Sequence, residues 1–193
     1  MRPIHKSFFM PFLLLFFLHT IEVVASERVL LDDWELPLGR IYEEQEFVLS
    51  GTAVLRVGLV FKGYAAALYV DPEKADRPLD PDTAKRLEIY YYHNTPRRRM
   101  IDTANETLER NLSAKKLQNL RPLIDKLHRV YRDGEKGGMA ALTFIPGKGT
   151  FFEMQNELLI HIPGDEFGPA YLKVWLGEQP SSRTVKEQLM RGL

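Results

Sequence analysis

Apolar side chains dominate residues 47–57 and 59–70, which are rich in valine, leucine, phenylalanine and tyrosine. The two runs are interrupted by three glycines: Gly51, Gly58 and Gly63. This pattern predicts paired strands with a turn or bulge near a glycine. Residues 71–81 contain three prolines and are predicted to form a loop, after which residues 87–92 return to the composition of a strand.

From Thr95 the apolar residues recur with the period of a helix. Thr95 suits the N-cap and Pro96 the first helical position. The apolar stripe behind them consists of Met100, Ile101, Ala104, Leu108 and Leu112. Ser113 can cap a second helix that is apolar on one side, and Pro122 is expected to kink or divide it before residues 134–138 end it.

The rest of the chain returns to strands and closes with helices. Residues 139–145, 150–154 and 158–162 predict a meander whose first turn has the hairpin composition Pro-Gly-Lys-Gly. Residues 166–176, stopped by Gly177, and residues 184–190 predict two further helices. The expected fold class is α+β with an antiparallel sheet, in one domain.

The N-terminus has the order of segments found in a secretory signal peptide. A short basic region precedes the apolar run 8–18, and small residues precede Ser26. The run of eleven apolar residues is too short for a spanning helix, which needs about 20. We therefore expect a signal peptide over residues 1–25, a domain over residues 26–193, periplasmic localisation and no stable membrane span.

Composition narrows the classes of partner. Without residues 1–25 the chain carries 24 basic and 25 acidic side chains, a balance that argues against nucleic acid as the main partner. The absence of cysteine excludes disulfides and thiolate metal sites. The three histidines beyond residue 25 have no metal-like spacing, so we expect them to be structural and expect no metal or cofactor: His93, His128 and His161.

Two clusters of polar residues stand out. The three arginines at 97–99 lie in the first turn of a predicted helix, where cations are disfavoured by about 0.3–1 kcal/mol each. They would suit a bound anion, but we favour the interpretation that they are solvated or paired with carboxylates, because exposed runs of charge usually contribute little. Asn105 lies at the edge of the apolar stripe and faces either a polar pocket or backbone partners.

Even spacing along the strand pair would place Arg56, Lys62 and Tyr64 on one face. On an unbroken strand Arg56 and Tyr64 are too far apart to share one ligand. They converge only if the chain turns or bulges near Gly58.

Three stretches, in this order, resemble the bacterial chalcone isomerase-like family. They are LSGTAVLRVGLVFKGYAAALYV (49–70), LEIYYYHNTPRRRMIDTANETLERNL (87–112) and LTFIPGKGTFFEMQNELLIHIPGDEFGPAYLKVWLGEQP (142–180). The resemblance implies an open-faced β-sandwich, in which helices are layered on a large antiparallel sheet with a ligand cleft between them. Active plant members close a chalcone to a flavanone, and other relatives bind fatty acids through an arginine and a tyrosine.

The family's site can be carried over residue by residue. Arg56 falls near the arginine that holds the anion, one residue off the register of the bacterial relatives. Tyr64 replaces a threonine of the plant enzyme, a substitution associated with the fatty-acid-binding relatives. Asn105 matches an asparagine that holds the ketone.

Two other positions depart from the plant enzyme. Arg98 takes the place of the catalytic tyrosine, and Val174, next to Trp175, takes that of a hydroxyl residue. The polar network of the enzyme is therefore incomplete, which makes a working isomerase less favoured.

Three functions remain open. The favoured one is a non-catalytic, exported protein that binds a small amphipathic carboxylate, with Arg56 and Tyr64 at the polar end of the cleft. The alternatives are a scaffold or assembly protein without a ligand, and an isomerase or intramolecular lyase. A binding protein should have a largely apolar cavity with a few converging polar groups, whereas a scaffold should have a filled cleft.

Overall fold

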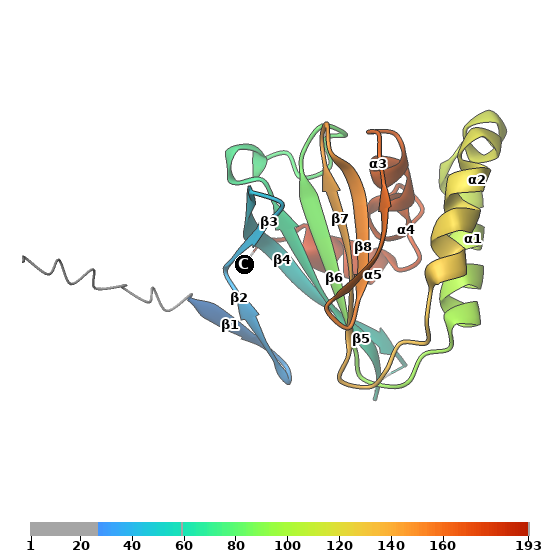
Figure 1. Ribbon diagram of the computed structural model, residues 1–193. Helices are drawn as coiled ribbons and strands as arrows, with labels where there is room; N and C mark the ends of the chain where they lie inside the picture. Colours follow the sequence, from blue (N-terminus) through green and yellow to red (C-terminus); the bar gives the residue numbers. More distant parts are fainter. Residues whose placement is uncertain (1–26, 59, 193) are drawn as a thin grey trace, which may run out of the picture.

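The centre of the molecule is a seven-stranded antiparallel sheet in which every strand pairs with its neighbours in the sequence (Figure 1). The computed structural model describes residues 27–58 and 60–192. The strands, in order across the sheet, are β3 (Gly39–Tyr42), β4 (Gln45–Val57), β5 (Phe61–Val70), β6 (Lys85–Tyr91), β7 (Met139–Ile145), β8 (Gly149–Met154) and β9 (Glu157–Ile162). The predicted α+β class with a large antiparallel sheet is confirmed.

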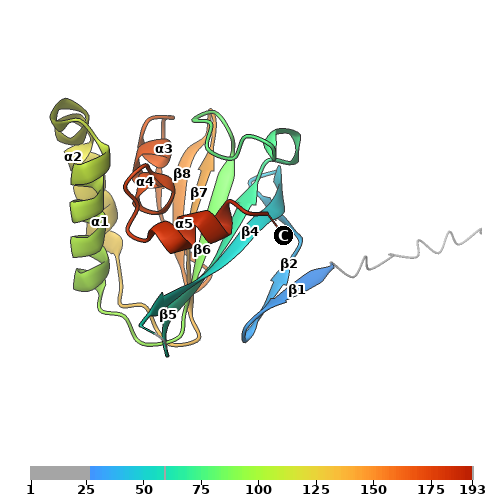
Figure 2. The same cartoon turned by 180° about the vertical axis from the view of Figure 1, so that it is seen from behind.

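The two faces of the sheet are covered by different elements. Figures 1 and 2 show the α-helices on one face and a separate hairpin on the other. The helices are α1 (Arg97–Asn111), α2 (Ala114–Val130), α3 (Phe167–Tyr171), α4 (Lys173–Leu176) and α5 (Arg183–Leu189). The hairpin consists of β1 (Arg28–Leu31) and β2 (Trp34–Pro37), and a short 3-10 helix, η1 (Pro72–Lys74), lies between β5 and β6.

This double cover explains the unbroken apolar run in β5. Ala66 and Leu68 belong to the core under the helices, whereas Ala65, Ala67 and Tyr69 belong to a second core on the hairpin face. Because successive side chains of a strand point to opposite faces, a strand covered on both sides loses its polar alternation.

The hairpin face also buries a charged network. Glu88 is fully buried, and its carboxylate accepts bonds from Arg86 Nε at 2.7 Å and Arg40 Nη2 at 2.9 Å. The Tyr90 hydroxyl donates to the same carboxylate, and Arg86 also pairs with Glu153. The arginines hold the pKa of Glu88 below its ordinary value, against the opposing effect of burial. The network ties β3, β6 and β8 together.

Two helix predictions differ from the structure. Pro122 does not divide α2, which continues to Val130. Pro122 and Gln118, whose carbonyl loses its usual donor, are both exposed, so water can hydrate that carbonyl. The predicted helix over residues 166–176 is two short helices, α3 and α4, separated at Leu172.

The start of α1 is also capped differently from the prediction. Pro96 is the N-cap residue, and the Thr95 hydroxyl donates to the His93 carbonyl. The backbone N–H of Arg97 donates instead to the Asp133 carboxylate at 2.7 Å. A carboxylate from the loop after α2 therefore accepts a bond from one of the free backbone N–H groups in the first turn of α1.

The N-terminal expectations are not tested by the structure. The predicted signal peptide, residues 1–25, lies outside the described residues. Within the part of the chain that the structure describes, no helix is both long and apolar enough to cross a membrane.

Candidate ligand-binding site

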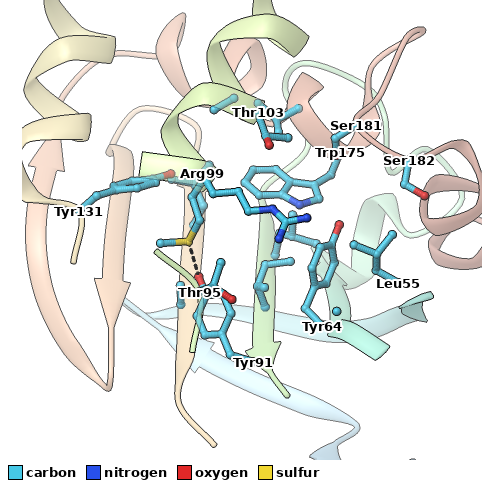
Figure 3. Close-up of a pocket in the computed structure, with 18 of the residues that line it drawn as sticks. Leu55, Tyr64, Tyr91, Thr95, Arg99, Thr103, Tyr131, Trp175, Ser181 and Ser182 are labelled. Carbon is cyan, nitrogen blue, oxygen red and sulfur yellow. Dashed lines mark hydrogen bonds between the residues drawn. The ribbon is translucent and has the colours of Figure 1, made fainter. Parts of the chain in front are cut away.

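A cavity of about 250 Å³ lies between the sheet and the helices (Figure 3). Its sheet side is formed by residues of β4 to β8, and its helix side by α1, α4 and the segments around them. Most lining side chains are apolar or aromatic, among them Leu55, Leu87, Ile89, Met100, Leu142, Phe152, Val174 and Trp175. A mostly apolar hollow with few polar groups is the usual character of a small-molecule site.

Strand register brings three of the lining side chains onto one face. Tyr64 on β5 pairs with Leu55 on β4 and with Tyr91 on β6. Paired residues of antiparallel strands project to the same side of the sheet, so all three project toward the helices. This alignment fixes the sheet wall of the cavity near its mouth, the end lined by the exposed residues Phe61, His93 and Arg99.

The Tyr64 hydroxyl is a neutral hydrogen-bonding group inside the cavity. Burial raises the pKa of Tyr64 to about 12, although hydrogen bonding to Trp175 and Ser181 acts in the opposite direction. Tyr64, Trp175 and Ser181 come from β5, α4 and the segment before α5, so side chains from three parts of the chain line this region of the cavity.

The three arginines of the first turn of α1 have three different environments. Arg97 lies along α2, where its guanidinium approaches the His128 carbonyl at 3.4 Å. Arg98 is 91% exposed and pairs with Asp102 at 3.7 Å. Arg99 lines the cavity, and Figure 3 shows its guanidinium reaching toward the Tyr64 hydroxyl. Within residues 27–58 and 60–192, Arg99 has no ion pair.

The buried side of the cavity contains a chain of hydrogen bonds. The Tyr131 and Tyr171 hydroxyls are 2.7 Å apart, and the Tyr171 hydroxyl is 2.9 Å from His128 Nε2. Both tyrosines line the cavity, whereas His128 lies behind Tyr171. Burial lowers the pKa of His128 to about 4, so the imidazole is neutral at neutral pH.

Arg56 does not face this cavity, which corrects the expected pairing of Arg56 with Tyr64. Arg56 pairs with Lys62 across the strands, and both approach Asp32 of the β1–β2 turn, at 3.8 and 3.3 Å. Gly63 is the extra residue of a bulge, because Leu55 pairs with Tyr64 while Arg56 pairs with Lys62. The bulge turns Tyr64 to the face opposite Lys62, and Leu55 takes the cavity position expected for the arginine.

Two further residues expected in the site also lie elsewhere. Arg98 points into solvent, as its exposure shows. Asn105 is half-buried between α1 and α2, where its side-chain oxygen accepts a bond from Arg121 at 3.1 Å. Neither proposed environment of Asn105, a polar pocket or backbone partners, is therefore the observed one. Of the six residues, the structure brings Tyr64, Val174 and Trp175 together.

The three histidines are held by contacts within the protein. His93 stacks on Phe61 at 4.7 Å beside the mouth, and His161 stacks on Phe151 at 4.3 Å. The described residues contain no group of three or more His, Cys, Asp or Glu side chains that could hold a metal ion.

Sequence reasoning missed Arg99, Tyr131 and Tyr171. Arg99 had a usable signal, because residues 99, 100, 103 and 104 recur on one side of a helix and all line the cavity. Tyr131 and Tyr171 had no local signal. They follow α2 and belong to α3, and only the tertiary fold brings their hydroxyls together.

Comparisons with known proteins bear on the family and the fold of the chain. The family model described as chalcone isomerase-like matches residues 30–191. Among solved structures, a fatty-acid binding protein of Arabidopsis thaliana aligns with 14% identity and a TM-score of 0.62, over 85% of this chain and 96% of that protein. No curated protein matches the sequence. At 14% identity the structural likeness establishes the fold alone. The family match covers most of the sequence, and the chain therefore belongs to the chalcone isomerase-like family.

Proposed function

We propose that the protein binds a small amphipathic acid, such as a fatty acid, in the cavity between the sheet and the helices. The observation that carries the proposal is the pairing of an apolar cavity with an arginine that has no carboxylate partner among the described residues. The carboxylate would lie at the mouth beside Arg99 and Tyr64, with the hydrocarbon chain against the apolar wall.

The chemistry of these two groups suits a carboxylate. An anion that enters an apolar cavity loses hydration, and this loss is costly unless a cation and hydrogen-bond donors replace the water. A guanidinium offers several N–H donors in a fixed plane, and the neutral Tyr64 hydroxyl adds one more. This assignment replaces Arg56 with Arg99 and keeps Tyr64.

The family and fold support binding, and the open cavity favours it over a scaffold. The Arabidopsis structure with the same fold is that of a fatty-acid binding protein. A scaffold without a ligand would be expected to fill the space between sheet and helices with side chains. We retain the proposal of export, which N-terminal sequencing of the mature protein tests by its expected start at Ser26.

The decisive comparison is between an acid and an uncharged molecule of the same chain length. We expect dodecanoic acid to displace a fluorescent fatty-acid probe from the purified protein, and dodecanol to compete more weakly. The preference should decrease at high salt, because the mouth is partly exposed to solvent. Equal competition by acid and alcohol would contradict recognition of the carboxylate, and no competition by either would contradict the proposed function.

A further inference from the structure

The buried side of the cavity holds two hydroxyl groups in fixed positions. Tyr131 stacks on Phe152 at 4.7 Å with an interplanar angle of 16°, and Tyr171 stacks on Phe167 at 5.4 Å with an angle of 25°. Tyr131 is 6% exposed and Tyr171 is 1% exposed. Because packed rings lose little further freedom when a ligand binds, these hydroxyls are preorganised for recognition.

The proton count leaves Tyr131 with an unused hydrogen-bonding position. Tyr171 has one proton, so it cannot donate to both His128 and Tyr131. If His128 donates to Tyr171, the Tyr171 proton can go to Tyr131, and the Tyr131 proton is then left for the cavity; if Tyr131 donates to Tyr171 instead, a Tyr131 lone pair is left. If His128 accepts from Tyr171, Tyr131 donates to Tyr171, and a Tyr131 lone pair is left for the cavity.

The hydrogen bonds that link Tyr131, Tyr171 and His128 can run in either direction because His128 is neutral. Burial lowers its pKa to about 4, so at neutral pH the imidazole can carry its proton on either nitrogen. Burial also raises the pKa of Tyr131 and Tyr171 above that of a free phenol, which keeps both as hydroxyls. Tyr131 can thus present a donor or an acceptor to the same region of the cavity.

We propose that Tyr131 recognises an oxygen on the ligand's chain, so that the ligand is an oxygenated fatty acid carrying a hydroxyl or keto group. This inference rests on the proposed function and adds a second polar contact to it. A plain hydrocarbon chain beside Tyr131 would leave its remaining position unpaired in a buried place, whereas a hydroxyl or keto oxygen satisfies it. His128 acts as a positioning residue, since it reaches the ligand only through Tyr171 and Tyr131.

The test compares dodecanoic acid with hydroxydodecanoic and oxododecanoic acids in which the oxygen is moved along the chain. The measured quantity is the ratio of the affinity of each oxygenated acid to that of dodecanoic acid, determined by calorimetry for each protein. In the wild type, we expect one position of the oxygen to increase affinity about two- to tenfold, as one net hydrogen bond would. Both the hydroxyl and the keto form at that position should show the increase.

Two variants identify the residue responsible. Tyr131→Phe should bring the ratio close to one, because the ring remains and only the hydroxyl is lost. Tyr42→Phe is the control, because it removes a hydroxyl on the hairpin face of the sheet, outside the cavity. Its ratio should stay at the wild-type value.

The outcomes separate this inference from the proposed function. Binding of dodecanoic acid with ratios near one at every position would overturn the inference and leave the proposed function standing. A ratio that survives Tyr131→Phe would also overturn it. Failure of every acid to bind would overturn both, whereas binding of an oxygenated acid alone would support the inference in its strongest form.

Discussion

One residue of helix register decides which arginine faces the ligand cavity. Arg98 and Arg99 are neighbours in the first turn of α1, yet Arg98 is 91% exposed and pairs with Asp102, whereas Arg99 lines the cavity. Residues one apart on a helix lie about 100° apart around its axis, so the two side chains point in different directions, although both residues are exposed to solvent.

This difference gives a matched pair of variants. Arg99→Ala should weaken binding of dodecanoic acid about five- to thirtyfold, which corresponds to about 1–2 kcal/mol for a charged hydrogen bond at a partly exposed mouth. Arg98→Ala removes the same charge from the same turn and should change the affinity less than about twofold. Isothermal titration of both variants decides the matter, and equal losses would show that only the overall charge of this surface is important.

His128 makes the stability of the fold depend on pH. Its folded-state pKa of about 4 is below the ordinary value of 6.5, so the unfolded chain binds the proton more readily. The stabilisation is complete above the ordinary value and is lost as pH falls toward 4, by at most about 1.4 kcal/mol per pH unit for one proton. Chemical denaturation between neutral pH and pH 4 should show that the free energy of unfolding falls more steeply with decreasing pH for wild type than for His128→Gln. Identical pH dependence in the two proteins would contradict the role of His128.

The packing of α5 on β4 depends on a glycine. A Cβ added at Gly51 would lie 2.1 Å from the Leu189 carbonyl oxygen of α5. The contact is reinforced by Gln188, whose side-chain oxygen accepts a bond from the Val54 N–H at 2.9 Å. Absence of a side chain at Gly51 therefore lets the helix approach the strand closely.

We expect Gly51→Ala to destabilise the protein by about 1–3 kcal/mol, because α5 must move away from the sheet. Gly39→Ala is the control, since its Cβ would meet the Phe47 carbonyl oxygen at an ordinary 3.6 Å. Denaturant unfolding should show a clearly larger loss of unfolding free energy for Gly51→Ala than for Gly39→Ala. A loss as small as that of the control would mean that α5 can move without cost.

Most strands and helices could be predicted from sequence because their signals are local. The strand at residues 139–145 was predicted with the observed bounds, and the caps at Ser113 and Gly177 are those observed. The hairpin β1–β2 and strand β3 were not predicted, because each strand has only four residues. Such short segments carry too little periodicity, and their burial depends on the sheet beneath them.

The ligand cavity and the charged network that stabilises the fold lie on opposite faces of the sheet. The helix face holds the cavity, whereas the hairpin face holds the pairs of the buried Glu88 with Arg86 and with the half-buried Arg40. Removal of one partner from a buried charged network leaves the others unpaired, which typically costs about 3–5 kcal/mol. The cost should appear in stability and not in the shape of the cavity.

Glu88→Gln should therefore lower the free energy of unfolding by about 2–4 kcal/mol. This is somewhat less than the cost of removing the whole group, because the amide oxygen can still accept hydrogen bonds from the arginines. Glu157→Gln is the control: its pair with Arg132 is exposed and should contribute little to the free energy of unfolding. Folded Glu88→Gln protein should bind dodecanoic acid like wild type. A specific loss of affinity in this variant would show that the two faces are coupled.

The site was harder to predict than the fold because it depends on strand register. The even spacing of Arg56, Lys62 and Tyr64 was interpreted as one face of a strand, and it holds for Arg56 and Lys62, which share Asp32. The bulge at Gly63 reverses the face of Tyr64. The sequence indicated a bulge near a glycine, but not which glycine or which side chains it would separate.

The most direct test of the account is a crystal structure of the protein with dodecanoic acid bound. We expect density for the acid between the sheet and α1, with its carboxylate within hydrogen-bonding distance of Arg99 and Tyr64 and its chain directed toward Tyr131. An acid bound on the hairpin face beside Arg56, or a cavity that stays empty while the acid binds elsewhere, would contradict the account.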